Sequence, residues 1–127
     1  MIALENPMTP ITVITEQFDK TSTSSVRALI EKRAEEEGLD PVQVSAIARC
    51  ESDYVWKAKN GSSSAESYFQ FIDGTWKSTL KRMGYEENIS KYDPELHIEA
   101  AIWLLKEDGT RHWNASKHCW DKPASAG

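Results

Sequence analysis

Apolar residues recur every three or four positions in the first half of the chain, which is the spacing of one face of an α-helix. Between residues 25 and 37 the apolar positions are Val26, Leu29, Ile30 and Ala34. Side chains of Thr23–Ser25 can cap the start of a helix there, and Gly38 can end it. The pattern therefore predicts a first helix over residues 25–37.

A second apolar stripe follows, and the signals at its start are stronger. Asp40 can cap a helix, Pro41 suits the first helical position, and Gln43 completes a capping box. The buried face is formed by Val44, Ile47 and Ala48. We predict a second helix over residues 41–52.

The second half of the chain predicts further helices after a polar loop at residues 53–64 and a short apolar, aromatic segment at residues 65–72. The helices are expected at residues 74–83, 95–108 and 110–120. Asp73 is the expected N-cap of the first of them, and Asp93-Pro94 begins the second. No strand-like alternation and no internal repeat is present in the sequence, so the predicted fold class is mostly α.

The two ends of the chain lack the helical pattern. Residues 1–22 combine prolines with Thr, Ser and Asn, which favours a flexible lead or linker with a short extended piece at residues 11–14. Residues 122–127 are expected to form a tail, which leaves residues 23–121 as one domain of the 127-residue chain. No apolar run approaches the length of a membrane span, and the first residues lack the features of a signal peptide.

Charge narrows the classes of partner. Fifteen basic and twenty acidic residues give a net charge of −5, which argues against nucleic-acid binding because phosphate neutralisation needs a basic surface. Residues 1–40 hold most of the excess, with four basic and eight acidic side chains. Residues 41–127, with eleven and twelve, are nearly neutral and suit an uncharged or mildly anionic substrate.

The cysteines leave two alternatives. Cys50 and Cys119 are too few for a disulfide-rich scaffold and lack the CxxC spacing of a zinc site. One long-range disulfide or two buried thiols fit this count. His112 and His118, beside Cys119, match no common ligand spacing, so we expect neither a metal nor a cofactor.

Glu51 is the most informative residue of the sequence. It is seven positions after Val44 and four after Ile47, so it continues the buried face of the second predicted helix. Burial and the helix C-terminus both disfavour a negative charge, which raises the pKa of a carboxyl and suits it to general acid catalysis. The alternative, a Glu paired with a lysine or arginine, fits the helical spacing equally well.

Aromatic residues favour a carbohydrate site. All five tryptophans follow Glu51 in the chain: Trp56, Trp76, Trp103, Trp113 and Trp120. Flat apolar rings with a polar handle are surfaces on which sugars stack, but they are also common in the core of a small domain. For Trp103, in the middle of a predicted helix, a place in the core is the better interpretation. For Trp56, in a polar loop, a place in a substrate groove fits as well as a place in the core.

Five segments follow one another in a recognisable order: Ala48-Arg49-Cys50-Glu51-Ser52, Asn60 to Ile72, Thr75-Trp76, Asp93-Pro94 to Leu105, and Trp113-Asn114-Ala115-Ser116. Together they resemble the soluble lytic transglycosylase family and its goose-type lysozyme relatives. In that family a Glu-Ser pair ends a helix and precedes a Ser-rich loop and an A-x-G-x-[FM]-Q-[FI] segment. The resemblance covers about residues 41–120 and implies a small lysozyme-like helical domain.

The resemblance implies cleavage of the β-1,4 bond between N-acetylmuramic acid and N-acetylglucosamine in peptidoglycan. In that family one Glu protonates the glycosidic oxygen and then accepts the proton of the muramyl C6 hydroxyl, which closes a 1,6-anhydro ring without water. Glu51 would take both roles. With Trp56, the expected substrate-binding residues are Ser64, Tyr68, Phe69, Gln70, Trp113 and Asn114. For Ser64 and Gln70 plain hydrogen bonding within the loop is the alternative.

Two other functions stay open at this point. Most glycosidases need two carboxylates, and Asp53 and Glu66 are candidate second carboxylates for a hydrolytic, lysozyme-like mechanism. Asp73 fits better as a helix cap. A non-catalytic glycan-binding or structural module is the remaining alternative.

Several residues depart from the family pattern, and Trp113-Asn114-Ala115-Ser116 is only a weak echo of the family's Tyr-Asn-Ala-Gly. Ser67 stands where the family has glycine, which costs free energy if the backbone needs a positive φ. His97 stands where asparagine is usual. Trp113 replaces a tyrosine whose hydroxyl lies near the catalytic acid in the family, and an indole offers only an N–H donor.

Compartment and assembly follow from the resemblance as well. The family's enzymes act outside the cytoplasm, where disulfides persist. The resemblance therefore implies a Cys50–Cys119 disulfide that ties the last helix to the catalytic one. It also implies extracytoplasmic action on peptidoglycan glycan strands, by a monomer.

Overall fold

A computed structural model describes residues 17–121, and in this part the chain is mostly helical, as the sequence predicts. Its helices are α1 (Thr23–Glu36), α2 (Pro41–Ser52), α3 (Asp73–Met83), α4 (Pro94–Asp108), the 3-10 helix η3 (Arg111–Ser116) and α5 (Lys117–Trp120). The extended piece expected at residues 11–14 and the tail at residues 122–127 lie outside the described residues.

Helices α2 and α4 begin where their capping residues predict a start, whereas α1 begins two residues earlier than expected, with Ser22 as its cap instead of Thr23–Ser25. The Ser22 hydroxyl accepts a hydrogen bond of 3.1 Å from the Ser25 amide at the start of α1. Asp40 caps α2 by accepting the amides of Val42 and Gln43, and Asp93 caps α4. Each cap satisfies one or two of the amides in the first helical turn that have no partner within the helix, which favours a helix start at that residue.

Two further expectations about helix ends are wrong. Asp73 is the first residue of α3 rather than its N-cap, and its carboxylate instead accepts a hydrogen bond of 2.6 Å from Lys91 Nζ. The single helix expected at residues 110–120 is divided into η3 and α5. The backbone of Trp113 leaves the helical region there, with φ −116° and ψ 19°.

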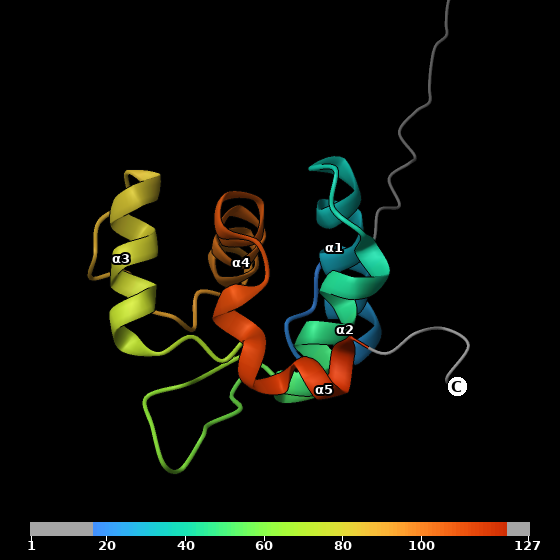
Figure 1. Cartoon of the computed structure of the whole chain (residues 1–127), viewed down its shortest axis with the longest axis horizontal. Coiled ribbons are helices and arrows are strands. Elements are labelled where there is room, and N and C mark those ends of the chain that lie inside the picture. Colours follow the sequence, from blue (N-terminus) through green and yellow to red (C-terminus); the bar gives the residue numbers. More distant parts are fainter. Residues whose placement is uncertain (1–16, 122–127) are drawn as a thin grey trace, which may run out of the picture.

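Helix α4 lies between α3 on one side and the α1–α2 pair on the other (Figure 1). Its position explains its composition, because a helix covered on most sides is apolar on most sides. The buried residues of α4 are His97, Ile98, Ala100, Ala101, Ile102, Leu104 and Leu105. Helix α2 packs on α1, and the apolar stripe predicted for α2 is in the core. The short helices η3 and α5 also pack on α2.

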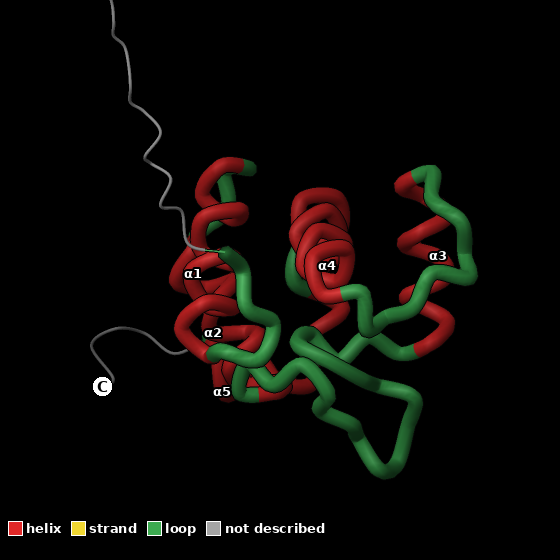
Figure 2. Tube along the Cα trace, turned by 180° about the vertical axis from the view of Figure 1, so that it is seen from behind, coloured by secondary structure: helices red, strands yellow, loops and turns green. Residues whose placement is uncertain are grey.

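A long loop connects α2 to α3 (Figure 2). The side chain of Lys91 holds this loop on the fold. The side chain of Lys91 is only 8% exposed, and its ammonium group donates to the carbonyls of Ser64 and Phe71 at 2.6 and 3.3 Å. It also pairs with the carboxylates of Glu66 at 3.1 Å and Asp73 at 2.6 Å. A buried ammonium needs this many acceptors to offset its lost hydration, so the two partly exposed carboxylates and the carbonyls satisfy it together.

His97 completes the anchor of the loop from within α4. Its Nδ1 donates to the carbonyl of Lys91 and its Nε2 accepts the amide of Phe69, both at 2.9 Å. Burial lowers the pKa of His97 to about 4, so the ring is neutral and can donate on one side and accept on the other. An asparagine amide has the same pair of functions, which explains in physical terms why His97 can occupy this position.

A disulfide joins Cys50 in α2 to Cys119 in α5, with 6.0 Å between the Cα atoms. The bond implied by the resemblance is therefore present, and the alternative of two free thiols is not. The closed loop spans 69 residues, and such a bond stabilises a fold by about 4 kcal/mol on the chain-entropy account. None of the helices between residues 17 and 121 is long and apolar enough to cross a membrane.

Candidate active site

Glu51 lies in the last turn of α2, at the end of the buried face of that helix. Its Oε2 accepts a hydrogen bond of 2.6 Å from the hydroxyl of Ser116. Burial raises the pKa of Glu51, and the Ser116 hydrogen bond opposes that rise. No salt bridge within residues 17–121 involves Glu51. The carboxyl is thus not the charge-paired structural group of the alternative interpretation, and it keeps its proton to a higher pH than an exposed Glu.

Ser116 is not among the residues that the sequence predicts for the site. It ends η3, and its hydroxyl also accepts a hydrogen bond of 3.1 Å from the indole N–H of Trp120. The one signal available in the sequence was the last residue of Trp113-Asn114-Ala115-Ser116, where the related motif has glycine. A serine there adds a hydroxyl, but only the fold shows that this hydroxyl meets Glu51.

The backbone at Ser67 adopts the conformation that favours glycine. Its φ is 70°, its side chain is fully buried, and its Oγ has no hydrogen-bond partner in the described part of the chain. The amide of Ser67 donates to the Ala58 carbonyl at 2.8 Å, which holds the turn closed. The expected penalty for serine at this position is therefore real, and it lies in the turn that leads to Gln70.

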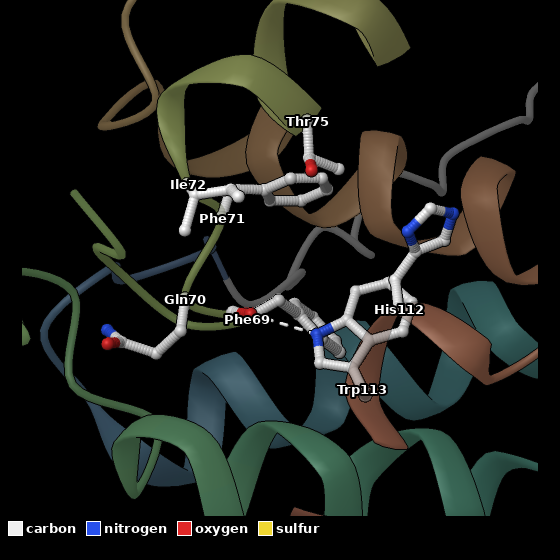
Figure 3. Close-up of a pocket in the computed structure, with 7 residues that line it drawn as sticks. All are labelled: Phe69, Gln70, Phe71, Ile72, Thr75, His112 and Trp113. Atoms are coloured by element: carbon white, nitrogen blue, oxygen red, sulfur yellow. Dashed lines mark hydrogen bonds between the residues drawn. The ribbon is translucent and has the colours of Figure 1, made fainter. Parts of the chain in front are cut away.

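A cavity of about 100 Å³ opens beside this turn. Its walls are formed by Phe69, Gln70, Phe71, Ile72, Thr75, His112 and Trp113. Figure 3 shows the indole N–H of Trp113 directed at the Phe69 carbonyl, which it meets at 2.9 Å. Because η3 carries both Trp113 and Ser116, one short helix contributes to the cavity wall and to the surroundings of Glu51.

Comparison with protein families matches the chain to the transglycosylase SLT domain over residues 28–118. This is more than half of the chain. The chain belongs to the transglycosylase SLT domain family. The match begins within α1, so it includes more of the fold than the motifs in residues 41–120 do. Comparison with curated proteins finds no significant match. Membership of the family supports a lytic-transglycosylase-type function that acts on peptidoglycan, and hence action outside the cytoplasm.

Trp113, which the resemblance places at the family's tyrosine, makes no hydrogen bond to Glu51 among the described residues. Its ring is buried and packs edge-on against Phe69 and Phe71, with centroids 5.9 and 6.2 Å apart. Its indole N–H is already used by the Phe69 carbonyl. The hydroxyl beside Glu51 comes from Ser116 instead.

Two expected substrate-binding side chains are in the core. Tyr68 and Phe69 are both fully buried. The Tyr68 hydroxyl donates to the carbonyl of Lys20 at 2.9 Å, and the Phe69 ring stacks on His97. Of the two, only Phe69 borders the cavity, and its contribution to the site is the carbonyl that holds Trp113.

Trp56 is half-buried and already has partners on its ring. Its indole N–H donates to the Tyr92 carbonyl at 2.9 Å. The ammonium groups of Lys20 and Lys57 lie 4.0 and 4.5 Å from the ring centroid. Trp56 is not part of the cavity wall. The structure therefore does not bring Trp56 together with the predicted residues that line the cavity.

The remaining expected substrate-binding residues divide between the loop and the cavity. The Ser64 hydroxyl accepts the Asp73 amide at 2.9 Å, which fits the alternative of loop hydrogen bonding. Gln70 lines the cavity while its amide nitrogen donates to the carbonyls of Ala58 and Ser67. Asn114 is exposed on η3, next to Trp113.

The two candidate second carboxylates have different surroundings from Glu51. Asp53 is exposed and adopts a left-handed conformation, with φ 54°, at the C-terminus of α2. Glu66 pairs with Lys91 and, at 3.6 Å, with Lys59, and the hydrogen bond from Lys91 lowers its pKa. Glu66 is thus held ionised as part of the loop anchor rather than left free to activate water.

His112 in the cavity wall is engaged by a carboxylate. Its Nε2 lies 2.8 Å from an oxygen of Asp108, which also binds Arg82 and Arg111. Among residues 17–121 no group of three or more His, Cys, Asp or Glu side chains is arranged to hold a metal ion.

Proposed function

We propose that the protein is a lytic transglycosylase that cleaves the β-1,4 bond between N-acetylmuramic acid and N-acetylglucosamine in peptidoglycan, with Glu51 as its single catalytic carboxyl. The observation that carries this proposal is the state of Glu51. It is a half-buried carboxyl at a helix end, with a raised pKa and a neutral hydroxyl as its hydrogen-bond partner. Such a group keeps its proton to a higher pH than an exposed Glu and can donate it to the departing sugar oxygen.

The reaction needs one proton to leave Glu51 and one to return. As the bond between C1 of the muramyl residue and the glycosidic oxygen breaks, Glu51 transfers its proton to that oxygen. The carboxylate then accepts the proton of the muramyl C6 hydroxyl, whose oxygen bonds to C1 and closes the 1,6-anhydro ring. The N-acetyl group of the substrate stabilises the positive charge at C1. No water is consumed, and Glu51 ends protonated as it began.

This mechanism fits the other carboxylates of the loop. A hydrolytic glycosidase needs a second carboxylate to activate water or to form a covalent intermediate. Asp53 points into solvent at the end of α2, and Glu66 is paired with Lys91. In a transglycosylase the nucleophile is a hydroxyl of the substrate, so neither carboxylate has to react. The proposed substrate-contacting residues are Gln70, Trp113 and Asn114, around the cavity and η3.

Mass spectrometry of digested peptidoglycan tests the proposal. Purified sacculi treated with the protein should yield fragments that end in 1,6-anhydro-muramyl residues. Asp53→Asn and Glu66→Gln should each retain the activity within about tenfold, because neither group reacts. Reducing ends, with a loss of about a thousandfold in either variant, would establish hydrolysis with a second carboxylate. Intact glycan strands would establish a non-catalytic module.

Place and assembly belong to the same proposal. We assign the catalytic domain to residues 23–121, acting as a monomer outside the cytoplasm, where both peptidoglycan and a stable disulfide are found. Size-exclusion chromatography with light scattering checks the monomer, for which a mass near 14.4 kDa is expected.

A further inference from the structure

The hydroxyl on Glu51 has a defined hydrogen-bond direction. Ser116 Oγ has three polar neighbours, namely Trp120 Nε1 at 3.1 Å, Glu51 Oε2 at 2.6 Å and the Trp113 carbonyl at 3.2 Å. An indole N–H can only donate, so Trp120 uses a lone pair of Oγ and leaves the hydroxyl hydrogen free to donate elsewhere. Of the two acceptors, Glu51 Oε2 is the nearer by 0.6 Å. Ser116 therefore donates to Glu51.

This direction distinguishes the two oxygens of the carboxyl. An oxygen that accepts a hydrogen bond from Ser116 is the carbonyl-like oxygen of a protonated carboxyl, so the proton resides on Oε1. After proton transfer the same hydrogen bond stabilises the carboxylate, because a bond to an ionised acceptor is stronger than one to a neutral acceptor. Ser116 thus acts both before and after the proton leaves.

A disulfide and two buried tryptophans restrict the position of Ser116 relative to Glu51. Cys50 directly precedes Glu51, and Cys119 follows Ser116 by three residues, so the disulfide joins the two backbones within one helical turn of the hydrogen bond. Trp113 and Trp120, on either side of Ser116 in sequence, are both buried. The disulfide and the two buried indoles restrict the backbone that carries Ser116. Its hydroxyl therefore loses little conformational freedom when it binds the carboxyl, and the hydrogen bond is preorganised.

We infer that Ser116 is a positioning residue for the catalytic acid: it holds Glu51 with the proton on Oε1 and stabilises the carboxylate that forms when the glycosidic bond breaks. The inference rests on the proposed function of Glu51. It assigns a role to a residue that the motif pattern of the chain did not select, and it places the required hydroxyl on the segment that the disulfide ties to α2.

Charged groups on the elements packed against α2 do not take over this role. Several are engaged with one another: Arg27 with Glu31, Arg33 with Glu99, Arg111 and His112 with Asp108, and Lys117 with Asp121. Others are exposed: Lys32, Glu35, Arg49, Asp53 and His118. The shift of the Glu51 pKa has two causes, burial and the Ser116 hydrogen bond. Removal of the hydroxyl should therefore be visible in the pH dependence of the reaction.

The test compares variants of residue 116 by their pH–rate profiles on purified peptidoglycan. Ser116→Ala should lower kcat by about 10- to 100-fold, which is the effect of losing one hydrogen bond to a charged group, with little change in KM. The limb on which activity falls as pH rises should move to higher pH, because the lost hydrogen bond favoured the carboxylate. Ser116→Thr should restore most of the rate and the original limb.

Matched variants keep the inference falsifiable. Ser116→Val has the shape of the threonine variant without its hydroxyl, so the Thr and Val pair decides the matter even if the alanine variant folds poorly. Lys117→Ala, an exposed neighbour in α5, should behave like the parent protein. A lower rate in both Ala and Val variants with an unmoved pH limb would mean a merely structural role, and a Val variant as active as Thr would also overturn the inference. Glu51→Gln separates the two proposals: if it is fully active, the proposed function fails, whatever Ser116 does.

Discussion

The carboxylates at the two ends of the long loop have opposite surroundings. Near α3, Glu66 and Asp73 share the ammonium group of Lys91, whose hydrogen bonds lower the pKa of both carboxyls. At the end of α2, Glu51 has burial and a single neutral hydroxyl, and its pKa is raised. The buried cation therefore anchors the loop from outside it, while the carboxyl proposed to react has no salt-bridge partner among residues 17–121 and can keep a proton.

The two regions also respond to pH in opposite directions. Glu66 has a lowered pKa in the fold, so its pairing contributes stability above the unfolded pKa near 4.5 and loses it as pH falls through the folded value. Glu51 has a raised pKa, so its contribution is complete below about 4.5 and is lost as pH rises through the folded value. The difference between anchoring and reacting carboxyls is thus measurable in stability as well as in activity.

The largest expected effect comes from Glu51→Gln. The amide keeps the shape of the side chain and removes the transferable proton, so cleavage of peptidoglycan should fall by about a thousandfold or more. Circular dichroism and thermal unfolding should show the same fold, because glutamine is at least as easily buried as a carboxyl. A variant that still digests sacculi at more than a few per cent of the parent rate would remove Glu51 from the mechanism.

The second effect concerns the covalent bond beside Glu51. Replacing both Cys50 and Cys119 with alanine should lower the free energy of unfolding by about 4 kcal/mol, since the bond closes a 69-residue span. Denaturant titration measures the change. Activity should fall further than stability alone explains, because Ser116 lies one turn from Cys119. Two reactive thiols in the unreduced, denatured parent protein would show that the bond does not form in solution.

The third effect concerns the ionic anchor at the other end of the loop. Lys91→Met leaves Glu66 and two carbonyls without their buried partner and should lower the free energy of unfolding by about 3 kcal/mol. In the pH–rate profile, the limb on which activity falls as Glu51 loses its proton should stay at the same pH. Lys91 is not among the causes of the Glu51 pKa shift.

Lys59 provides the matched control for this variant. It pairs with the same carboxylate of Glu66 at 3.6 Å, but its side chain is 72% exposed. Lys59→Met should therefore change the free energy of unfolding by no more than about 0.5 kcal/mol. Equal losses in the two lysine variants would mean that burial of Lys91 contributes nothing to the anchor.

Sequence patterns predict the fold where the determinants are local. The Asp-Pro pairs at residues 40–41 and 93–94 each mark the start of a helix, and the apolar stripe of residues 41–52 places Glu51 on the buried face as expected. Caps and periodicity act within one or two turns, so a single sequence contains them. The division of residues 110–120 at Trp113 depends instead on the contact of its indole with the Phe69 carbonyl, 44 residues away.

The site is predicted only in part for the same reason. Lys91 is an isolated lysine between two turns and carries no signal of burial, although four groups of the loop and α3 converge on it. Ser116 reaches Glu51 across 65 positions of sequence. Tyr68 was expected to bind the substrate because of its place in a motif, but the fold buries its ring. Motifs identify which residues are near the site, and packing decides which of them face it.

The smallest expected effect concerns Ser67, in the turn between the two regions. Ser67→Gly should raise the free energy of unfolding by about 1 kcal/mol. Glycine removes the strain of φ 70° and the buried hydroxyl that has no partner in residues 17–121, and these gains outweigh its extra freedom in the unfolded chain. Denaturant titration measures the gain, and activity should stay within a few-fold of the parent, because Ser67 does not line the cavity.

Gly84 allows the strain and the hydroxyl to be separated. It has a φ of 89°, and a Cβ built there would meet nothing within 4 Å, so Gly84→Ser introduces left-handed serine without burying a hydroxyl. If Gly84→Ser lowers the free energy of unfolding by about 1 kcal/mol and Ser67→Gly raises it, most of the Ser67 effect comes from the backbone conformation. If Gly84→Ser leaves the free energy of unfolding unchanged, the Ser67 effect comes from the buried hydroxyl. A destabilised Ser67→Gly variant would contradict both, and would mean that the loop held by Lys91 gains more from the serine side chain than it loses to its conformation.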